Sequence, residues 1–97
     1  MITINDILKG VEVLSVKGDS ERKIEGVEFD SRKVGSRYLF VAVRGTNSDG
    51  HKFVKQAIEA GASAIICEKL PADPDPSVCW IRTSDSATAL GIVCSNY

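Results

Sequence analysis

Residues 39–43 decide the fold, and they read Leu-Phe-Val-Ala-Val. Five consecutive apolar residues without alternation are typical of a strand that is covered on both faces. We therefore expect this strand to lie inside a sheet rather than at its edge. Phe40 and Val41 point to opposite faces of such a strand, so both should be buried.

The residues after this strand predict a strand–helix–strand unit. Residues 45–50 form a polar loop, and Asp49 is a suitable N-cap for a helix that Gly61 ends. The apolar face of that helix would consist of Phe53, Val54, Ala57 and Ile58. Residues 64–67, Ala-Ile-Ile-Cys, then predict a second buried strand, connected by a right-handed crossover if the two strands are parallel.

The flanking segments predict the other elements. Thr3 and Asp6 fit a capping box for a short helix ended by Gly10. Shorter apolar runs predict strands at residues 13–16, at 24–29 with Val27 and Phe29 on one face, and at 78–81. The fold class is therefore α/β, with a small mixed or mostly parallel sheet of about five strands flanked by helices.

The last segment predicts a helix capped by Ser84. Its apolar positions follow helical spacing: Ala87, Leu90, Val93 or Cys94, and Tyr97. Because the segment reaches Tyr97 without a glycine, a proline or a polar tail, we expect the natural chain to continue. Residues 1–97 otherwise form one domain without an internal boundary.

Composition excludes several classes of partner. The formal net charge is −1 over 97 residues, which argues against nucleic acid, and no signal peptide or membrane-binding segment is recognisable. We expect a cytoplasmic protein with no membrane partner. Cys67, Cys79 and Cys94 form no C-x-x-C pair, which favours mostly buried free thiols over zinc ligands or disulfides.

Catalytic motifs are missing from the sequence. It contains no G-x-x-x-x-G-K-[ST], G-x-G-x-x-G, H-E-x-x-H or G-x-S-x-G pattern. The single histidine, His51, has no cysteine or second histidine near it, which favours a solvated residue at a helix start over a general base or a metal ligand. We therefore predict no catalytic residue, no metal site and no bound cofactor within residues 1–97.

Two loops could bind a ligand. Residues 29–33, Phe-Asp-Ser-Arg-Lys, follow a predicted strand and could contact a phosphate, a ribose or a base. Alternatively, Asp30 and Arg32 form a local ion pair and Ser31 bonds the backbone. Residues 44–51 leave the strand at 39–43 and enter a helix start, where free N–H groups favour anions, or they form a plain capped loop. Together the two loops could form one crevice.

Read in order, these motifs resemble the N-terminal domain of the Mur ligases. The resemblance rests on Asp-Ser-Arg at 30–32, Leu-Phe-Val-Ala at 39–42 and Asp-Gly-His at 49–51, and it extends over nearly the whole chain. Arg-Gly-Thr at 44–46 and Ser-Asn-Tyr at 95–97 favour the family member that adds the third amino acid of the peptidoglycan peptide. The sister ligase that adds D-Ala-D-Ala shares a looser version and is kept as an alternative.

The resemblance implies a ligand and a set of partners. In the family this domain binds the uridine-diphosphate end of UDP-N-acetylmuramoyl-dipeptide, while a central domain holds ATP and Mg²⁺ and a C-terminal domain helps to bind the amino acid. The implied substrate-binding residues here are Phe29, Ser31, Thr46, Asn47 and Ser48. The partners would be this substrate and the two further domains, and residues 1–97 alone would be inactive as an ATPase or ligase.

One departure and two competing functions qualify this interpretation. Arg37 and Tyr38 stand where the family usually has Gly-Asp, so we expect a local difference in the turn. A free-standing nucleotide-binding module and a protein-interaction domain are the competing functions, and binding of a uridine nucleotide separates the interaction domain from the others.

Overall fold

The computed structural model describes residues 2–45 and 49–97. Its main sheet has five strands in the order β2 (Val13–Lys17), β7 (Cys79–Thr83), β6 (Ala64–Cys67), β5 (Tyr38–Val41) and β4 (Gly26–Glu28). The pairings from β4 to β7 are parallel, and β2 joins β7 antiparallel. The predicted α/β class with a mixed sheet of about five strands is confirmed.

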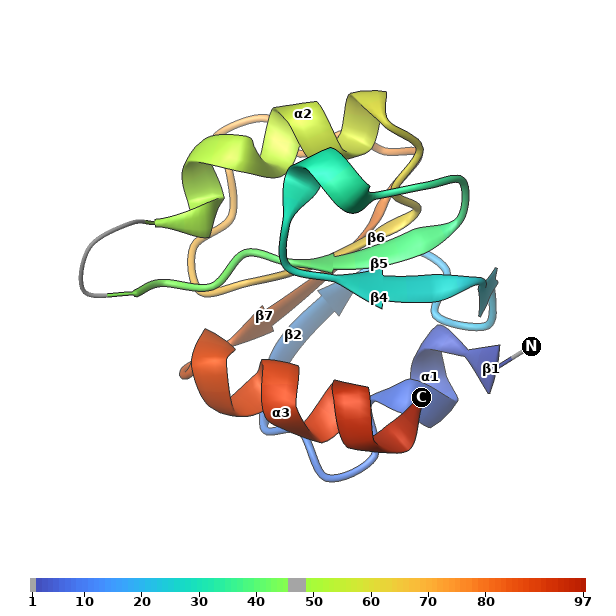
Figure 1. Ribbon diagram of the computed structural model, residues 1–97. Helices are drawn as coiled ribbons and strands as arrows, with labels where there is room; N and C mark the ends of the chain where they lie inside the picture. The colour runs from blue at the N-terminus through green and yellow to red at the C-terminus, as the bar shows by residue number, and fades with distance from the viewer. Residues whose placement is uncertain (1, 46–48) are drawn as a thin grey trace.

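Helices cover both faces of this sheet (Figure 1). On one face lie α1 (Ile4–Ile7) and α3 (Ser86–Asn96). On the other lie two 3₁₀ turns, η1 (Ser31–Lys33) and η2 (Gly50–Phe53), together with α2 (Val54–Glu59). A separate pair of short strands, β1 (Ile2–Thr3) and β3 (Lys23–Ile24), lies near the N-terminus.

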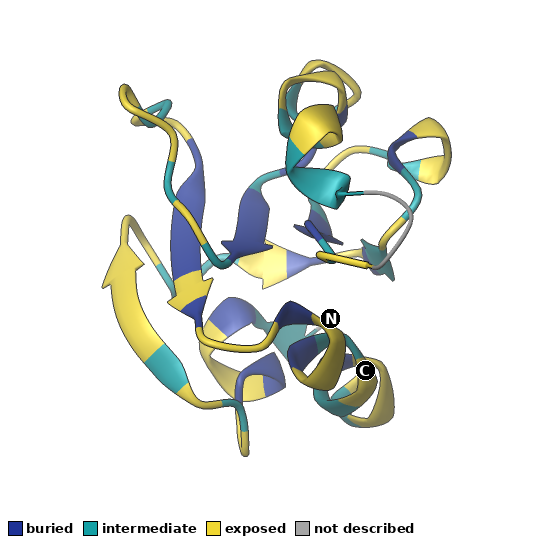
Figure 2. Ribbon diagram, turned by 90° about the vertical axis from the view of Figure 1, so that its left-hand side faces the viewer, coloured by how far each residue is buried: buried dark blue, intermediate teal, exposed yellow. Residues whose placement is uncertain are grey.

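The expected interior strand is confirmed. β5 lies between β4 and β6, and Phe40 and Val41 are completely buried. Phe40 belongs to the apolar cluster under α2, whereas Val41 belongs to the cluster under α1 and α3. Figure 2 shows the consequence, because the inner strands of the sheet are dark blue and therefore buried, while β2 is mostly exposed. Because successive side chains point to opposite faces, one sheet contributes to two apolar cores, one on each face.

The predicted strand over 24–29 is wrong in extent. The chain divides at Glu25: β3 pairs with β1, and only β4 joins the main sheet. The backbone N–H of Glu25 donates to the carbonyl of Arg37 instead, over 2.9 Å. Phe29 lies beyond the end of β4 and is exposed, so it does not share a strand face with Val27.

The helix predictions need three corrections. The helix after Asp49 begins as η2, and Phe53 is exposed rather than part of its apolar face. Asp85, not Ser84, caps α3, because its carboxylate accepts the Thr88 N–H over 3.1 Å. Tyr97 and Ala87 are exposed; the buried positions of α3 are Ser86, Ala89 and Val93.

The cysteine prediction is confirmed for two of the three thiols. Cys67 and Cys79 are buried in strands, and burial raises the pKa of the Cys67 thiol to about 11. Cys94 is exposed on α3. Among the described residues, no helix is both long enough and apolar enough to cross a membrane.

The turn before β5 carries an unusual backbone. Arg37 has φ +60°, the left-handed region that favours glycine, although its side chain pairs with Glu25 over 2.9 Å. The Tyr38 ring packs against Gly26, where a Cβ would come within 2.5 Å of it. The expected local difference at Arg37 and Tyr38 therefore includes a backbone at Arg37 that has the conformation favoured by glycine.

The left-handed backbone of this turn predicts that glycine at position 37 is more stabilising than alanine. Arg37→Gly and Arg37→Ala both remove the ion pair, but only alanine keeps a Cβ in the left-handed conformation. We expect the glycine variant to have the higher free energy of unfolding, by about 1 kcal/mol. Urea denaturation of both variants measures the difference, and an alanine variant as stable as the glycine variant would contradict the strain argument.

Candidate functional site

The carboxyl edge of the parallel strands carries both predicted loops. β4 and β5 are parallel neighbours, with Glu28 beside Phe40, so the chain leaves both strands at the same edge of the sheet. Phe29 and Ser31 follow β4, and Arg44 and Asp49 bound the loop that follows β5. Thr46, Asn47 and Ser48 lie outside the described residues.

Phe29 and Ser31 differ sharply in environment. The Phe29 side chain follows the end of β4 and is 61% exposed, an unusual position for a large apolar ring. Ser31 is buried at the start of η1, and its hydroxyl donates to the amide oxygen of Gln56 in α2 over 3.1 Å. This bond fixes η1 against α2 and leaves the lone pairs of the Ser31 hydroxyl as acceptors for a ligand.

Asp30 and Arg32 form the local ion pair that the sequence left as an alternative. The guanidinium of Arg32 donates to both carboxylate oxygens of Asp30, over 3.0 and 2.9 Å. This donation, with a further bond from the Arg32 N–H, lowers the pKa of Asp30 to about 2. The pair shapes the turn, and the predicted backbone bond from Ser31 is replaced by the bond to Gln56.

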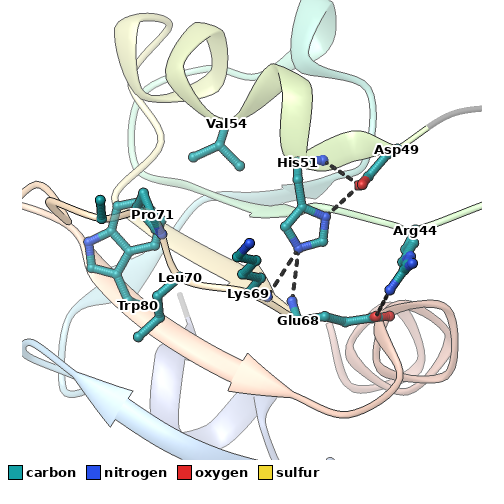
Figure 3. A pocket seen from close by; sticks show the side chains of 10 residues that line it. Arg44, Asp49, His51, Val54, Glu68, Lys69, Leu70, Pro71 and Trp80 are labelled. Carbon is teal, nitrogen blue, oxygen red and sulfur yellow. Dashed lines mark hydrogen bonds and ion pairs between the residues drawn. The ribbon is translucent and has the colours of Figure 1, made fainter.

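The neighbouring edge, after β5 and β6, borders an open pocket of about 610 Å³ (Figure 3). Polar and apolar side chains share its wall: Arg44, Asp49, His51, Val54, Glu68, Lys69, Leu70, Pro71, Ala72 and Trp80. The arrangement can hold a ligand by hydrogen bonds and charge. The described residues contain no cluster of three or more His, Cys, Asp or Glu side chains placed to hold a metal ion.

His51 is not the solvated residue that the sequence favoured. Its side chain is only 19% exposed, and its Nδ1 lies 2.6 Å from a carboxylate oxygen of Asp49. Its Nε2 accepts the backbone N–H of Glu68 over 3.0 Å, so the ring carries its proton on Nδ1 (Figure 3). Bonds from the His51 N–H and then from its ring hold the pKa of Asp49 below the usual range.

Glu68 and Ser86 were missed by the sequence analysis. The Glu68 carboxylate accepts the Ser86 N–H and hydroxyl over 2.9 and 2.7 Å, and these bonds lower the pKa of Glu68. Ser86 in turn accepts the N–H of Arg44 over 2.9 Å. Glu68 and Ser86 each come after a strand of the parallel sheet, at the edge where α/β proteins gather their functional side chains. Their position after predicted strands was the one feature of the sequence that could have indicated them.

The fold and the two loops define an α/β domain that presents two candidate binding segments at the carboxyl edge of a parallel sheet. The chain belongs to the Mur ligase family: residues 23–97 match the family described as "Mur ligase family, catalytic domain". The match covers most of the sequence, so the family resemblance is confirmed.

Relatives and solved structures agree with this assignment. The chain is 40% identical to the UDP-N-acetylmuramoyl-L-alanyl-D-glutamate–2,6-diaminopimelate ligase of Bacteroides thetaiotaomicron and 42% identical to that of Cytophaga hutchinsonii, over 97% of its length in both cases. It spans about a fifth of either relative: 20% of each.

Two solved structures resemble the fold. The UDP-N-acetylmuramoylalanyl-D-glutamyl-2,6-diaminopimelate–D-alanyl-D-alanyl ligase of Acinetobacter baumannii superposes with a TM-score of 0.80 at 22% identity, over 97% of this chain and 21% of that one. The MurF ligase of Thermotoga maritima, solved with ADP, gives 0.60 at 30% identity, over 71% of this chain and 16% of that one.

Proposed function

We propose that residues 1–97 bind the uridine-diphosphate end of UDP-N-acetylmuramoyl-dipeptide for a ligase that adds the third amino acid of the peptidoglycan peptide. The observation that carries the proposal is the parallel pairing of β4 with β5 in a chain of the Mur ligase family. It directs both candidate loops to one edge of the sheet. The relatives at 40% and 42% identity support the substrate, because their name includes UDP-N-acetylmuramoyl-L-alanyl-D-glutamate.

Each candidate residue has a role that suits its environment. The exposed ring of Phe29 offers an apolar surface to the uracil base. Ser31 would accept one hydrogen bond beside it, since its hydroxyl proton is already donated to Gln56. Thr46, Asn47 and Ser48 would supply further hydrogen bonds to the uridine, and their assignment rests on the family resemblance.

The other parts of the reaction would belong to the rest of a longer cytoplasmic enzyme. Residues 1–97 have no phosphate-cradling G-x-x-x-x-G-K-[ST] loop, and the described residues have no cluster suited to a metal ion. We assign the binding of ATP and Mg²⁺ to a central domain. A C-terminal domain would select the amino acid.

A nucleotide titration followed by NMR tests the proposal. UDP should shift the backbone amides of residues 29–32 and 45–50, because these residues line the proposed site, and ADP is the control for recognition of the base. Saturating UDP that leaves both segments unshifted while other amides move would overturn the site. Equal shifts with ADP would overturn the preference for uridine.

Ser31→Ala is expected to weaken UDP binding by about 2- to 13-fold. A neutral hydrogen bond contributes about 0.5–1.5 kcal/mol net, and about 1.4 kcal/mol corresponds to a factor of ten. Gln56→Ala is the matched control, since it removes the partner of the Ser31 hydroxyl but keeps the hydroxyl itself. Calorimetric titration gives both dissociation constants. An unchanged constant for Ser31→Ala would remove Ser31 from the site.

A further inference from the structure

We propose that Gln56 is a specificity-determining residue that makes the Ser31 hydroxyl an acceptor toward the ligand, so that Ser31 recognises the N3–H of a uracil base. The inference rests on the proposed function, because Ser31 is one of its candidate contacts. Both residues lie in elements on the same face of the sheet, Ser31 in η1 and Gln56 in α2 (Figure 1).

The hydrogen bond between Ser31 and Gln56 fixes the direction of the Ser31 hydroxyl. A serine hydroxyl has one proton to donate and two lone pairs that accept. Its proton goes to the amide oxygen of Gln56 over 3.1 Å, and no other described residue hydrogen-bonds this hydroxyl. What Ser31 still offers to a ligand is therefore an acceptor.

The burial of Ser31 makes this polarity important. Ser31 is 5% exposed, whereas Gln56 lies on the exposed side of α2. A ligand group that replaces water at a buried acceptor must supply a proton, because two acceptors that face each other both lose their hydrogen bonds to water. The pair should therefore disfavour a base that presents an acceptor to Ser31.

The charges of the segment favour a base over a phosphate beside Ser31. The Arg32 guanidinium is already engaged by both carboxylate oxygens of Asp30, and this donation lowers the pKa of Asp30 to about 2, so the carboxylate stays ionised. A phosphate oxygen would face the lone pairs of Ser31 and this negative charge. The exposed ring of Phe29, two residues earlier, instead suits a planar base.

Uracil and cytosine differ in the group that such an acceptor recognises. Uracil carries a hydrogen on N3, whereas cytosine carries a lone pair there. The ribose and the diphosphate are the same in UDP and CDP, so the ratio of the two dissociation constants isolates the base. We expect that a preference for UDP depends on Gln56.

Gln56→Leu tests the proposal because it removes the acceptor of the Ser31 proton and keeps a long side chain on α2. Calorimetric titration with UDP and with CDP gives the ratio. The unaltered chain should bind UDP about tenfold more tightly than CDP, and Gln56→Leu should reduce this preference to about threefold or less, because the freed proton can be donated to N3 of cytosine. Gln56→Glu has only acceptor oxygens and should retain the preference.

Lys55→Leu is the matched control. It places leucine at the neighbouring exposed position of α2, and the lost charge affects UDP and CDP alike, so the ratio should not change. Ser31→Ala removes the hydroxyl itself and should lower the ratio as Gln56→Leu does, so it replaces that variant if it does not fold. An equal loss of affinity for UDP and CDP in Gln56→Leu would mean that Gln56 only supports the structure, and would overturn the inference.

The failure of the proposed function is distinguishable from the failure of this inference. If the unaltered chain binds UDP, and either binds CDP equally well or keeps its preference in Gln56→Leu, the role of Gln56 is overturned and the proposed function stands. If the unaltered chain binds no UDP, the proposed function is overturned, and the role of Gln56 with it.

Discussion

Replacing Phe40 with alanine is expected to lower the free energy of unfolding by about 3–5 kcal/mol. Phe40 is completely buried in β5 and is the largest of the fully buried side chains. It packs under α2 in the cluster that contains Ala57, Ile65 and Trp80. Removing its ring leaves a cavity between the sheet and the helix that the neighbouring strands cannot fill.

Thermal and urea denaturation measure this loss. Domains of ordinary stability unfold with about 5–15 kcal/mol, so the substitution should remove a large share of the stability. Phe29→Ala is the matched control, because it removes the same ring from an exposed position. It should change stability by less than about 0.5 kcal/mol while weakening UDP binding. Comparable destabilisation by both substitutions would contradict the division between core and site.

The sheet interior could be predicted because burial leaves a direct pattern in the sequence. Residues 39–43 and 64–67 are uninterrupted apolar runs, and both became inner strands of the parallel sheet. Gly61 ended α2 as expected, with φ +117°. Local chemistry also located the Thr3 cap, whose hydroxyl accepts the Asp6 N–H. These features depend on a few neighbouring residues, which a single sequence displays.

The errors arose where distant residues decide the structure. The division of the 24–29 segment involves Arg37 and Tyr38 in a later turn, which contact Glu25 and Gly26. The Glu25 carbonyl also accepts the hydroxyl of Tyr97 at the far end of the sequence. Asp85 and Ser84 are both good cap residues, and the choice between them depends on Glu12, which bonds the Ser84 hydroxyl from the opposite part of the chain. No local pattern contains this information.

The same reason explains what was missed at the site. Both loops were identified, because turn residues after apolar strands mark them in the sequence. The environment of His51 was not, since its ring contacts the backbone of Glu68, 17 residues later. Glu68 and Ser86 carry no motif, and only the parallel order of β5, β6 and β7 brings them beside Arg44.

Gly50→Ala is expected to damage the fold and the proposed site together. A Cβ at position 50 would lie 2.7 Å from the backbone nitrogen of Val43 and 3.0 Å from its carbonyl oxygen. These are backbone atoms of the segment leaving β5, so rotation of a side chain cannot relieve the clash. The Gly50 N–H must keep its 2.7 Å bond to that carbonyl for the base of the loop to stay closed.

The substitution should therefore cost about 1–3 kcal/mol of stability and weaken UDP binding, because η2 must move away from β5. Gly91→Ala is the control, for which the expected change in stability has the opposite sign. Gly91 lies in α3 with open space around its Cβ position, so alanine there should raise stability by about 0.5–1 kcal/mol. Denaturation and UDP titration of both variants test the pair. A Gly50→Ala variant with unchanged stability and affinity would mean that the close approach of η2 to Val43 does not hold the loop.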